Sequence, residues 1–196
     1  LAGPEAARAD ATIVSATIEN GYPKTLTFKL STRAEADITG VTLHYAISGR
    51  GTSAIGKPED FAPAKQVDVQ VAIQVNSGNS YIPVGSLFTY HWEIETADGK
   101  TTSGPEATYL FMPPNKDWKS VKNDFMEIYY HGDREALAGT YLKAAQDTYQ
   151  KIGALLNVKL TQMPVRVILF ADEKELDSAR AGLSAGSFDA AVTTCG

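Results

Sequence analysis

The first half of the chain, from Ala11 to Met112, alternates apolar and polar residues with a period of two. Because successive side chains on a β-strand point to opposite faces, each such run has one face for a core and one for water. The pattern therefore predicts a series of half-buried strands. They are expected at Ile13 to Ile18, Leu26 to Leu30, Val41 to Ile47, Val67 to Ile73, Phe88 to Ile94 and Ala107 to Phe111.

Turn-forming residues separate these runs, at Asn20 to Pro23, Ser48 to Gly51, Asn76 to Asn79 and Asp98-Gly99. The last of them predicts a tight hairpin. Six or seven short antiparallel strands in about 100 residues predict an immunoglobulin-like or fibronectin type III-like β-sandwich over residues 11–112, with Trp92 in its core. The single cysteine, Cys195, cannot form an intrachain disulfide, which favours the fibronectin-like variety.

A proline-containing segment, Met112-Pro113-Pro114, interrupts the alternation. Two consecutive prolines cannot donate ladder hydrogen bonds, and they stiffen the chain. We therefore expect a short linker over residues 113–118 and a second domain over residues 119–196. Trp118 either anchors a contact between the domains or begins the core of the second one.

The second half begins with a strand, a turn and a long helix. Phe125 to Tyr130 is a β-prone run, and His131-Gly132-Asp133 is a turn. Asp133 is expected to cap a helix from about Arg134 to Leu156 by accepting hydrogen bonds from its free N–H groups. The apolar residues of this helix recur at the spacing of one amphipathic face: Leu137, Tyr141, Ala145, Ile152, Leu155 and Leu156.

A second strand, a short helix and a third strand are predicted after the long helix. Val165 to Phe170 is a nearly continuous apolar run, typical of a strand buried on both faces. Asp172-Glu173-Lys174-Glu175 is a capping box that opens a helix to about Ala181, and Ala190 to Cys195 predicts the third strand. Because strand–helix–strand order implies a right-handed crossover, residues 119–196 are predicted to form a partial α/β domain of βαβαβ order.

The composition narrows the class of protein. With 43% hydrophobic and 21% charged residues, the chain has the composition of a globular protein. The formal net charge of -5 provides no basic surface for nucleic acid and disfavours anionic membranes. No apolar run reaches the ~18 residues needed to span a bilayer. Ala7-Arg8-Ala9 has the A-x-A form of a signal-cleavage site, so residues 1–10 are either a signal-peptide remnant or a plain N-terminal tail.

Two groups of residues have side chains suited to metal binding or acid–base chemistry. His44 and His91 lie on the polar phase of their strands and could share a metal ion, but ordinary surface histidines are the favoured interpretation. Asp172, Glu173 and Glu175 gather where a helix N-terminus favours negative charge. A metal or acid–base role for these carboxylates is the alternative.

Three further features of the second half have both a functional and a structural interpretation. His131 beside Asp133 is interpreted as an exposed histidine in a turn, with a functional pair as the alternative. Tyr129 and Tyr130 are either a surface patch or strand residues. Cys195 has no His or Asp nearby in the sequence, so a buried structural thiol is favoured over a reactive one. No residue of the chain is therefore predicted to be catalytic, cofactor-binding or metal-binding.

Several segments carry a family resemblance: Tyr90 to Ile94 through Asp98-Gly99-Lys100, Trp118, Ile128 to Asp133, the long helix ending at Ile152-Gly153, and Met163 to Phe170. They resemble bacterial secreted or surface proteins in which an immunoglobulin- or fibronectin-like domain precedes a peptidase MA-like (gluzincin) domain. The resemblance implies an extracytoplasmic zinc metallopeptidase. In that family a helical His-Glu-x-x-His supplies two zinc ligands and a downstream glutamate supplies the third.

None of the three histidines, His44, His91 and His131, lies in such a motif, so no zinc ligand is carried over. Zinc is expected only if a C-terminal continuation carries His-Glu-x-x-His. The resemblance implies that the chain is a truncated N-terminal part of an exported protein, extracellular or at the cell surface, that serves as a scaffold or docking part. An α/β unit ending on its third strand would also leave an open sheet edge.

Two other functions are compatible with the pattern. The chain can be a non-catalytic surface or filament subunit whose edge strand, Ala190 to Cys195, pairs with a neighbouring chain. The expected partners are accordingly a protein substrate, a neighbouring surface protein or another copy of the chain. Carbohydrate binding is a third possibility, because exposed tyrosines such as Tyr22 and Tyr81 could stack on sugars.

Overall fold

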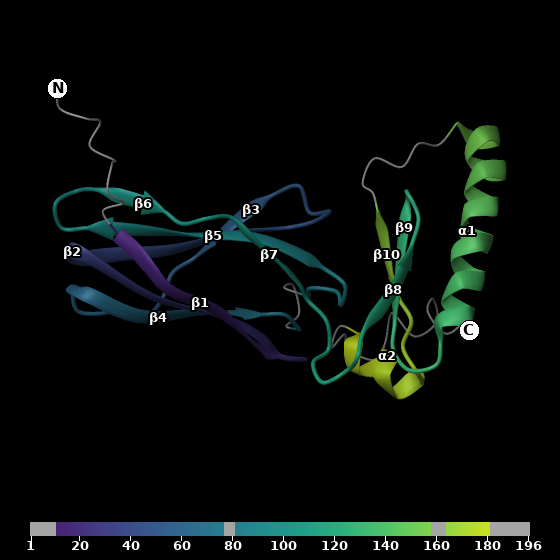
Figure 1. Ribbon diagram of the computed structural model, residues 1–196, viewed down its shortest axis with the longest axis horizontal. Coiled ribbons are helices and arrows are strands. Elements are labelled where there is room, and N and C mark those ends of the chain that lie inside the picture. The colour runs from purple at the N-terminus through teal and green to yellow at the C-terminus, as the bar shows by residue number, and fades with distance from the viewer. Residues whose placement is uncertain (1–10, 77–80, 158–163, 181–196) are drawn as a thin grey trace, which may run out of the picture. The chain divides into compact units, whose positions relative to one another are not determined.

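The structure, a computed structural model, describes residues 11–76, 81–157 and 164–180. They form two units, whose elements Figure 1 labels. The first unit contains residues 11–76 and Ser86–Phe111, and the second contains Tyr81–Gly85, 112–157 and 164–180. The division after Phe111 lies one residue before the predicted end of the β domain. Tyr81–Gly85 belongs to the second unit, whereas the sequence pattern had placed it in the first.

The first unit is an antiparallel sheet of seven strands in which β2 is the common partner. β1 and β4 pair with the first half of β2, β3 and β5 pair with its second half, and β6 and β7 pair with β5. The strands are β1 (Ala11–Gly21), β2 (Thr25–Ile47), β3 (Ser53–Gly56), β4 (Ala64–Gln74), β5 (Leu87–Thr96), β6 (Thr101–Ser103) and β7 (Ala107–Leu110).

The length of β2 was not predicted, because the sequence pattern indicated two separate strands where one strand of 23 residues runs. The joining stretch contains Ala, Glu and Asp, which are depleted in strands and so gave no strand signal. In the structure the alternation nevertheless continues through it, with half-buried Ala34 and Ala36 between exposed Arg33, Glu35 and Asp37. The register with β4 and β5 shifts at Ile38, where the two halves of the strand meet.

Aromatic contacts hold the two halves of this curled sheet together. Phe28, from the first half of β2, lies 6.0 Å from Phe88 and 5.0 Å from Tyr90 of β5, measured between ring centroids. Phe28 and Phe88 are fully buried, and Trp92 is 2% exposed. The predicted antiparallel β-rich unit and the core position of Trp92 are thus confirmed, whereas the immunoglobulin or fibronectin type stays a prediction.

The second unit is built on a sheet of three strands in the order β10-β9-β8. β9 runs antiparallel to β8 and parallel to β10, and α1 connects β9 to β10 along the chain (Figure 1). The elements are β8 (Lys119–Lys122), β9 (Met126–Tyr130), α1 (Glu135–Leu156), β10 (Val165–Ile168) and α2 (Glu173–Ala179).

The core of this unit lies between the sheet and one side of α1. Ile128, Tyr130 and Ala138 are buried together, and Leu142 packs against them. Near the other end of the helix, Tyr149 stacks on Phe125 with ring centroids 5.0 Å apart. Small Ala138 lets the helix approach β9 closely, so this side faces the sheet.

Several details of the predicted second domain are wrong. The N-cap of α1 is Arg134 and no side chain caps it, so Asp133 does not have its predicted role. β10 ends at Ile168, two residues early, and its side chains are half-buried rather than buried on both faces. The third strand, Ala190 to Cys195, lies outside the described residues, so the βαβαβ order stays a prediction. Among the described helices, none is long and apolar enough to cross a membrane.

The burial of Phe28 predicts that its replacement destabilises the first unit. Replacing Phe28 with Ala removes a fully buried ring between the two halves of β2 and should lower the free energy of unfolding by about 3–5 kcal/mol. Urea denaturation followed by Trp fluorescence measures the change. Val14→Ala is the control, because Val14 on β1 is 55% exposed; equal effects of the two substitutions would contradict the packing described.

Candidate functional site

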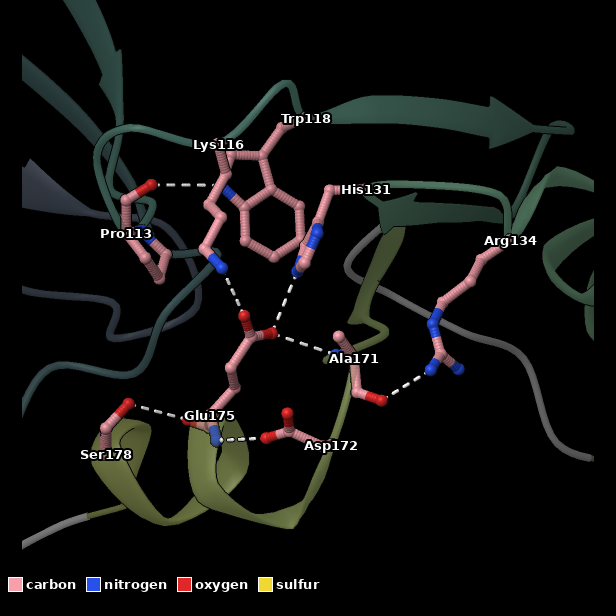
Figure 2. Close-up of polar contacts among 9 residues, drawn as sticks. All are labelled: Pro113, Lys116, Trp118, His131, Arg134, Ala171, Asp172, Glu175 and Ser178. Atoms are coloured by element: carbon pink, nitrogen blue, oxygen red, sulfur yellow. Dashed lines mark hydrogen bonds and ion pairs between the residues drawn. The ribbon is translucent and has the colours of Figure 1, made fainter.

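The side chain of Glu175 is the centre of the most extensive polar cluster of the second unit (Figure 2). The cluster includes the N-terminal cap of α2, where the Asp172 carboxylate accepts a hydrogen bond from the Glu175 N–H at 2.9 Å. The Glu175 carboxylate turns back and accepts from the N–H of Ala171, also at 2.9 Å. The Asp172 half of the predicted capping box is therefore present, whereas the Glu175 side chain accepts from the residue before the N-cap instead of from the N-cap itself.

Two side chains from distant parts of the sequence donate to the same carboxylate. His131, which follows β9, lies with Nε2 2.8 Å from Oε2 of Glu175, and Lys116 forms an ion pair with Oε1. Because an ionised carboxylate only accepts hydrogen bonds, Nε2 of His131 is the donor. The side chains of His131 and Glu175 are 12% and 22% exposed, so water reaches the pair poorly.

An aromatic side chain covers His131. Trp118 meets the imidazole edge to face, with centroids 4.8 Å apart, and Phe170 lies against the same indole at 6.4 Å. The indole N–H donates to the carbonyl of Pro113 at 2.9 Å. Trp118 therefore packs within the second unit, which is one of the two roles predicted for it.

The electrostatics of the cluster exclude Glu175 from acid–base work near neutral pH. The pKa of Glu175 falls from 4.5 to about 2, chiefly through the hydrogen bond from Lys116, with further contributions from the N–H of Ala171 and from His131. Three donors hold the carboxylate in its charged form. A general base should have a pKa near the working pH, so the Glu175 carboxylate is unsuited to that role, and its contacts join separate segments of the chain.

The histidine pair of the first unit is also assembled. His44 and His91 face each other across β2 and β5, with stacked rings 4.8 Å apart and planes 2° from parallel. Glu93 Oε1 lies 3.6 Å from His44 Nε2, too far for a hydrogen bond. In the part of the chain that the structure describes, no group of three or more His, Cys, Asp or Glu side chains is arranged to hold a metal ion.

Two open grooves lie on the first unit. One, of about 310 Å³, crosses β1, β2 and β4 between Lys29, Asp68 and Gln70. The other, of about 350 Å³, is lined by Lys57, Asp60 and other residues of the segment after β3. Both are lined mainly by exposed or half-buried polar side chains, and neither assembles a catalytic arrangement.

The most unusual surface of the described chain is an apolar stripe along α1. Leu137, Tyr141, Ile152 and Leu155 are 38%, 49%, 48% and 83% exposed. With the exposed small residues Ala144 and Thr148, they form what we name the α1 stripe: Leu137, Tyr141, Ala144, Thr148, Ile152 and Leu155. Leu156, 67% exposed, borders it. Large contiguous apolar surfaces commonly mark interaction sites.

The stripe corrects the predicted apolar face of the long helix. Of the residues expected on that face, only Ala145 is half-buried, and the others are exposed. The side that packs on the sheet carries Ala138, Leu142 and Tyr149 instead. The helix is apolar on two adjacent sides, and the spacing in the sequence identified the side that is left open.

Other candidate residues fall in different places. His131 pairs with Glu175 and not with exposed Asp133, and Tyr130 is a core residue. Tyr129 is half-buried, and this burial raises its pKa. The tyrosines considered for sugar binding are half-buried too: Tyr22 packs on Phe111, and the Tyr81 hydroxyl donates to the carbonyl of Ala179 at 2.7 Å. Cys195 lies outside the described residues.

The pairing of His131 with Glu175 could not have been found from the sequence. The two residues are 44 positions apart, and neither belongs to a motif that indicates the other. Glu173, which shares the acidic helix start, is exposed. The capping-box spacing and the acidic helix start both identified Glu175, but neither indicated His131 or Lys116 as its partner.

Comparison with known proteins leaves the family open. No family model matches the chain, and no curated protein matches it in sequence. A solved crystal structure described as a Br derivative of BhCBM56 is similar at a TM-score of 0.36 and 14% identity, covering 52% of this chain and 92% of that one. A likeness at this score is too weak to transfer a fold or a ligand.

A substitution of Glu175 tests how much its cluster contributes to the stability of the protein. Glu175→Gln removes the charge that Lys116 and His131 share, and should lower the free energy of unfolding by about 2 kcal/mol. Glu173→Gln, on the same turn but exposed, is the matched control and should change it by less than about 0.5 kcal/mol. Urea denaturation of both variants at pH 7 measures the difference, and equal stabilities would refute the positioning role.

The stabilisation that Glu175 provides should depend on pH. The folded-state pKa of Glu175, about 2, is below the ordinary value of 4.5, so its stabilisation is fully present above pH 4.5 and is lost as the pH falls towards 2. We expect about 1–2 kcal/mol, because solvent screens the partly exposed Lys116. The stability of the wild-type protein minus that of Glu175→Gln, measured from pH 7 to pH 2.5, should shrink over this range; a constant difference would contradict the assignment.

Proposed function

We propose that this chain is a docking scaffold of an exported protein, in which a β-sandwich of the immunoglobulin or fibronectin type precedes a peptidase MA-like α/β part. The antiparallel pairing of β1 and β4 on one half of β2 and of β3 and β5 on the other supports the sandwich. The parallel β9–α1–β10 connection supports the α/β part. The zinc of such a protein would belong to a segment with His-Glu-x-x-His, and no residue of this chain is proposed as its ligand.

The observation that carries the proposal is the α1 stripe. Its four large side chains are 38–83% exposed on a helix whose neighbouring side is already packed on the sheet. Burying one such side chain typically contributes about 1.5–3 kcal/mol. A partner that covers the stripe would therefore gain substantial binding free energy, which an isolated unit forgoes.

The polar contacts of Glu175 also support a scaffold role, because they hold the beginning of α1 in place. One carboxylate joins the segment around Lys116, the end of β9 at His131 and the start of α2. Arg134, which precedes α1, adds a hydrogen bond to the carbonyl of Ala171. These ties join the beginning of α1 to the start of α2 and give the helix a defined position.

An assembly subunit is the second candidate function. Within the described residues, β10 pairs on its β9 side only, so its other edge offers backbone groups to a further strand. The edge originally predicted for this role, Ala190 to Cys195, lies outside those residues. Both candidates require a partner for the second unit, and they differ in whether a strand edge or the helix stripe is used.

Side-chain footprinting tests the docking scaffold. The protein isolated from its native source and the purified 196-residue chain, the latter diluted until it is monomeric, are labelled with a photoactivated carbene. The modification of Tyr141, Ile152 and Leu155 is then compared by mass spectrometry. We expect several-fold protection of these residues in the native-source protein, with exposed Val14 and Ile55 of the first unit as internal controls. Equal labelling of the stripe in both samples would overturn the proposed function.

A further inference from the structure

The α1 stripe has an internal symmetry that restricts what can cover it. Its members lie 9, 5 and 2 residues before position 146, at Leu137, Tyr141 and Ala144, and 2, 6 and 9 residues after it, at Thr148, Ile152 and Leu155. The pattern thus reads nearly the same in both directions. Because α1 is a regular helix over Glu135–Leu156, these six residues follow a single line along it, about 27 Å long.

We propose that the partner of the stripe is the same stripe of a second copy, packed antiparallel; this inference rests on the docking function proposed above. In that arrangement Leu137 lies opposite Leu155 of the second copy, and Tyr141 lies opposite its Ile152. The small residues Ala144 and Thr148 meet at the centre, where two crossing helices approach most closely. Large side chains then fill both ends of the contact.

The charges beside the stripe differ between the two directions in which the helices can pack. Lys143 and Asp147 form an (i, i+4) ion pair at 2.9 Å on the flank away from the sheet, and Lys151 lies on the same flank. In an antiparallel pair the same flank of each helix faces its counterpart, and Lys143 of each copy lies near both Asp147 and Lys151 of the other. In a parallel pair the two charged flanks lie on opposite sides of the contact, so the attraction between Lys143 of one copy and Asp147 of the other is absent.

The size of the contact sets its strength. One helix face covers less than the roughly 800 Å² per partner of a standard interface, so the dimer should be weak, with a dissociation constant in roughly the micromolar range. Closure by a two-fold axis limits assembly to two copies through this face.

Sedimentation velocity of the full 196-residue chain from about 5 to 300 μM, a range chosen to bracket that affinity, tests the dimer. We expect a reversible monomer–dimer equilibrium that Leu137→Asp weakens at least ten-fold. Leu176→Asp is the matched control, because Leu176 on α2 is also 38% exposed but lies off the stripe. Circular dichroism verifies that both variants are folded. A chain that stays monomeric throughout would overturn the second-copy partner, and so would a dimer that Leu137→Asp and Leu176→Asp weaken equally.

Disulfide trapping tests the direction without disturbing the stripe. In a Cys195→Ser background, which removes the single native cysteine, Thr140→Cys and Lys151→Cys proteins are oxidised separately and as a mixture. Antiparallel packing predicts a cross-link between Cys at 140 and Cys at 151 that forms at least ten-fold faster than either self-cross-link. Faster self-cross-linking would overturn the antiparallel arrangement. Protection in the footprinting experiment without any dimer would refute the second copy while leaving the docking function intact.

Discussion

The side of α1 that meets the sheet determines which surface the second unit can offer a partner. Ala138, fully buried against Ile128 and Tyr130, brings the helix close to β9. Leu142 packs on the same cluster, and Tyr149 stacks on Phe125 near the far end. With this side buried, the neighbouring line of larger apolar residues has no sheet beneath it. Exposure of the α1 stripe is therefore a direct consequence of how the core of the unit is packed.

The two units achieve order in different ways. The first depends on β2, a continuous strand whose two halves are held together by Phe28 between Phe88 and Tyr90. The second has a small sheet, and its segments are additionally joined by the charged cluster around Glu175. A half-buried charge network of this kind adds specificity of position as well as stability. It keeps the start of α1 fixed, which a binding surface on that helix requires.

The β elements could be predicted from the sequence because alternation reports a buried face directly, as Trp92 and the runs around Phe28 and Val41 illustrate. The continuity of β2 could not, since Ala and Glu carry no strand signal. In α1, both adjacent sides are apolar, so helical spacing alone could not tell which side Ala138 would turn towards the sheet. The His131–Glu175 contact joins residues far apart in the chain, and only the folded structure brings them together.

The α1 stripe lies outside the core of the second unit, and a pair of substitutions tests this most directly. Leu155→Asp places a charge on the stripe, and Leu142→Asp places the same charge on the side that packs against Ile128 and Tyr130. Urea denaturation at low protein concentration should show a change within about 0.5 kcal/mol for Leu155→Asp and a loss of about 2 kcal/mol or more for Leu142→Asp. Equal losses for both variants would mean that the stripe belongs to the core, and the docking account would fail.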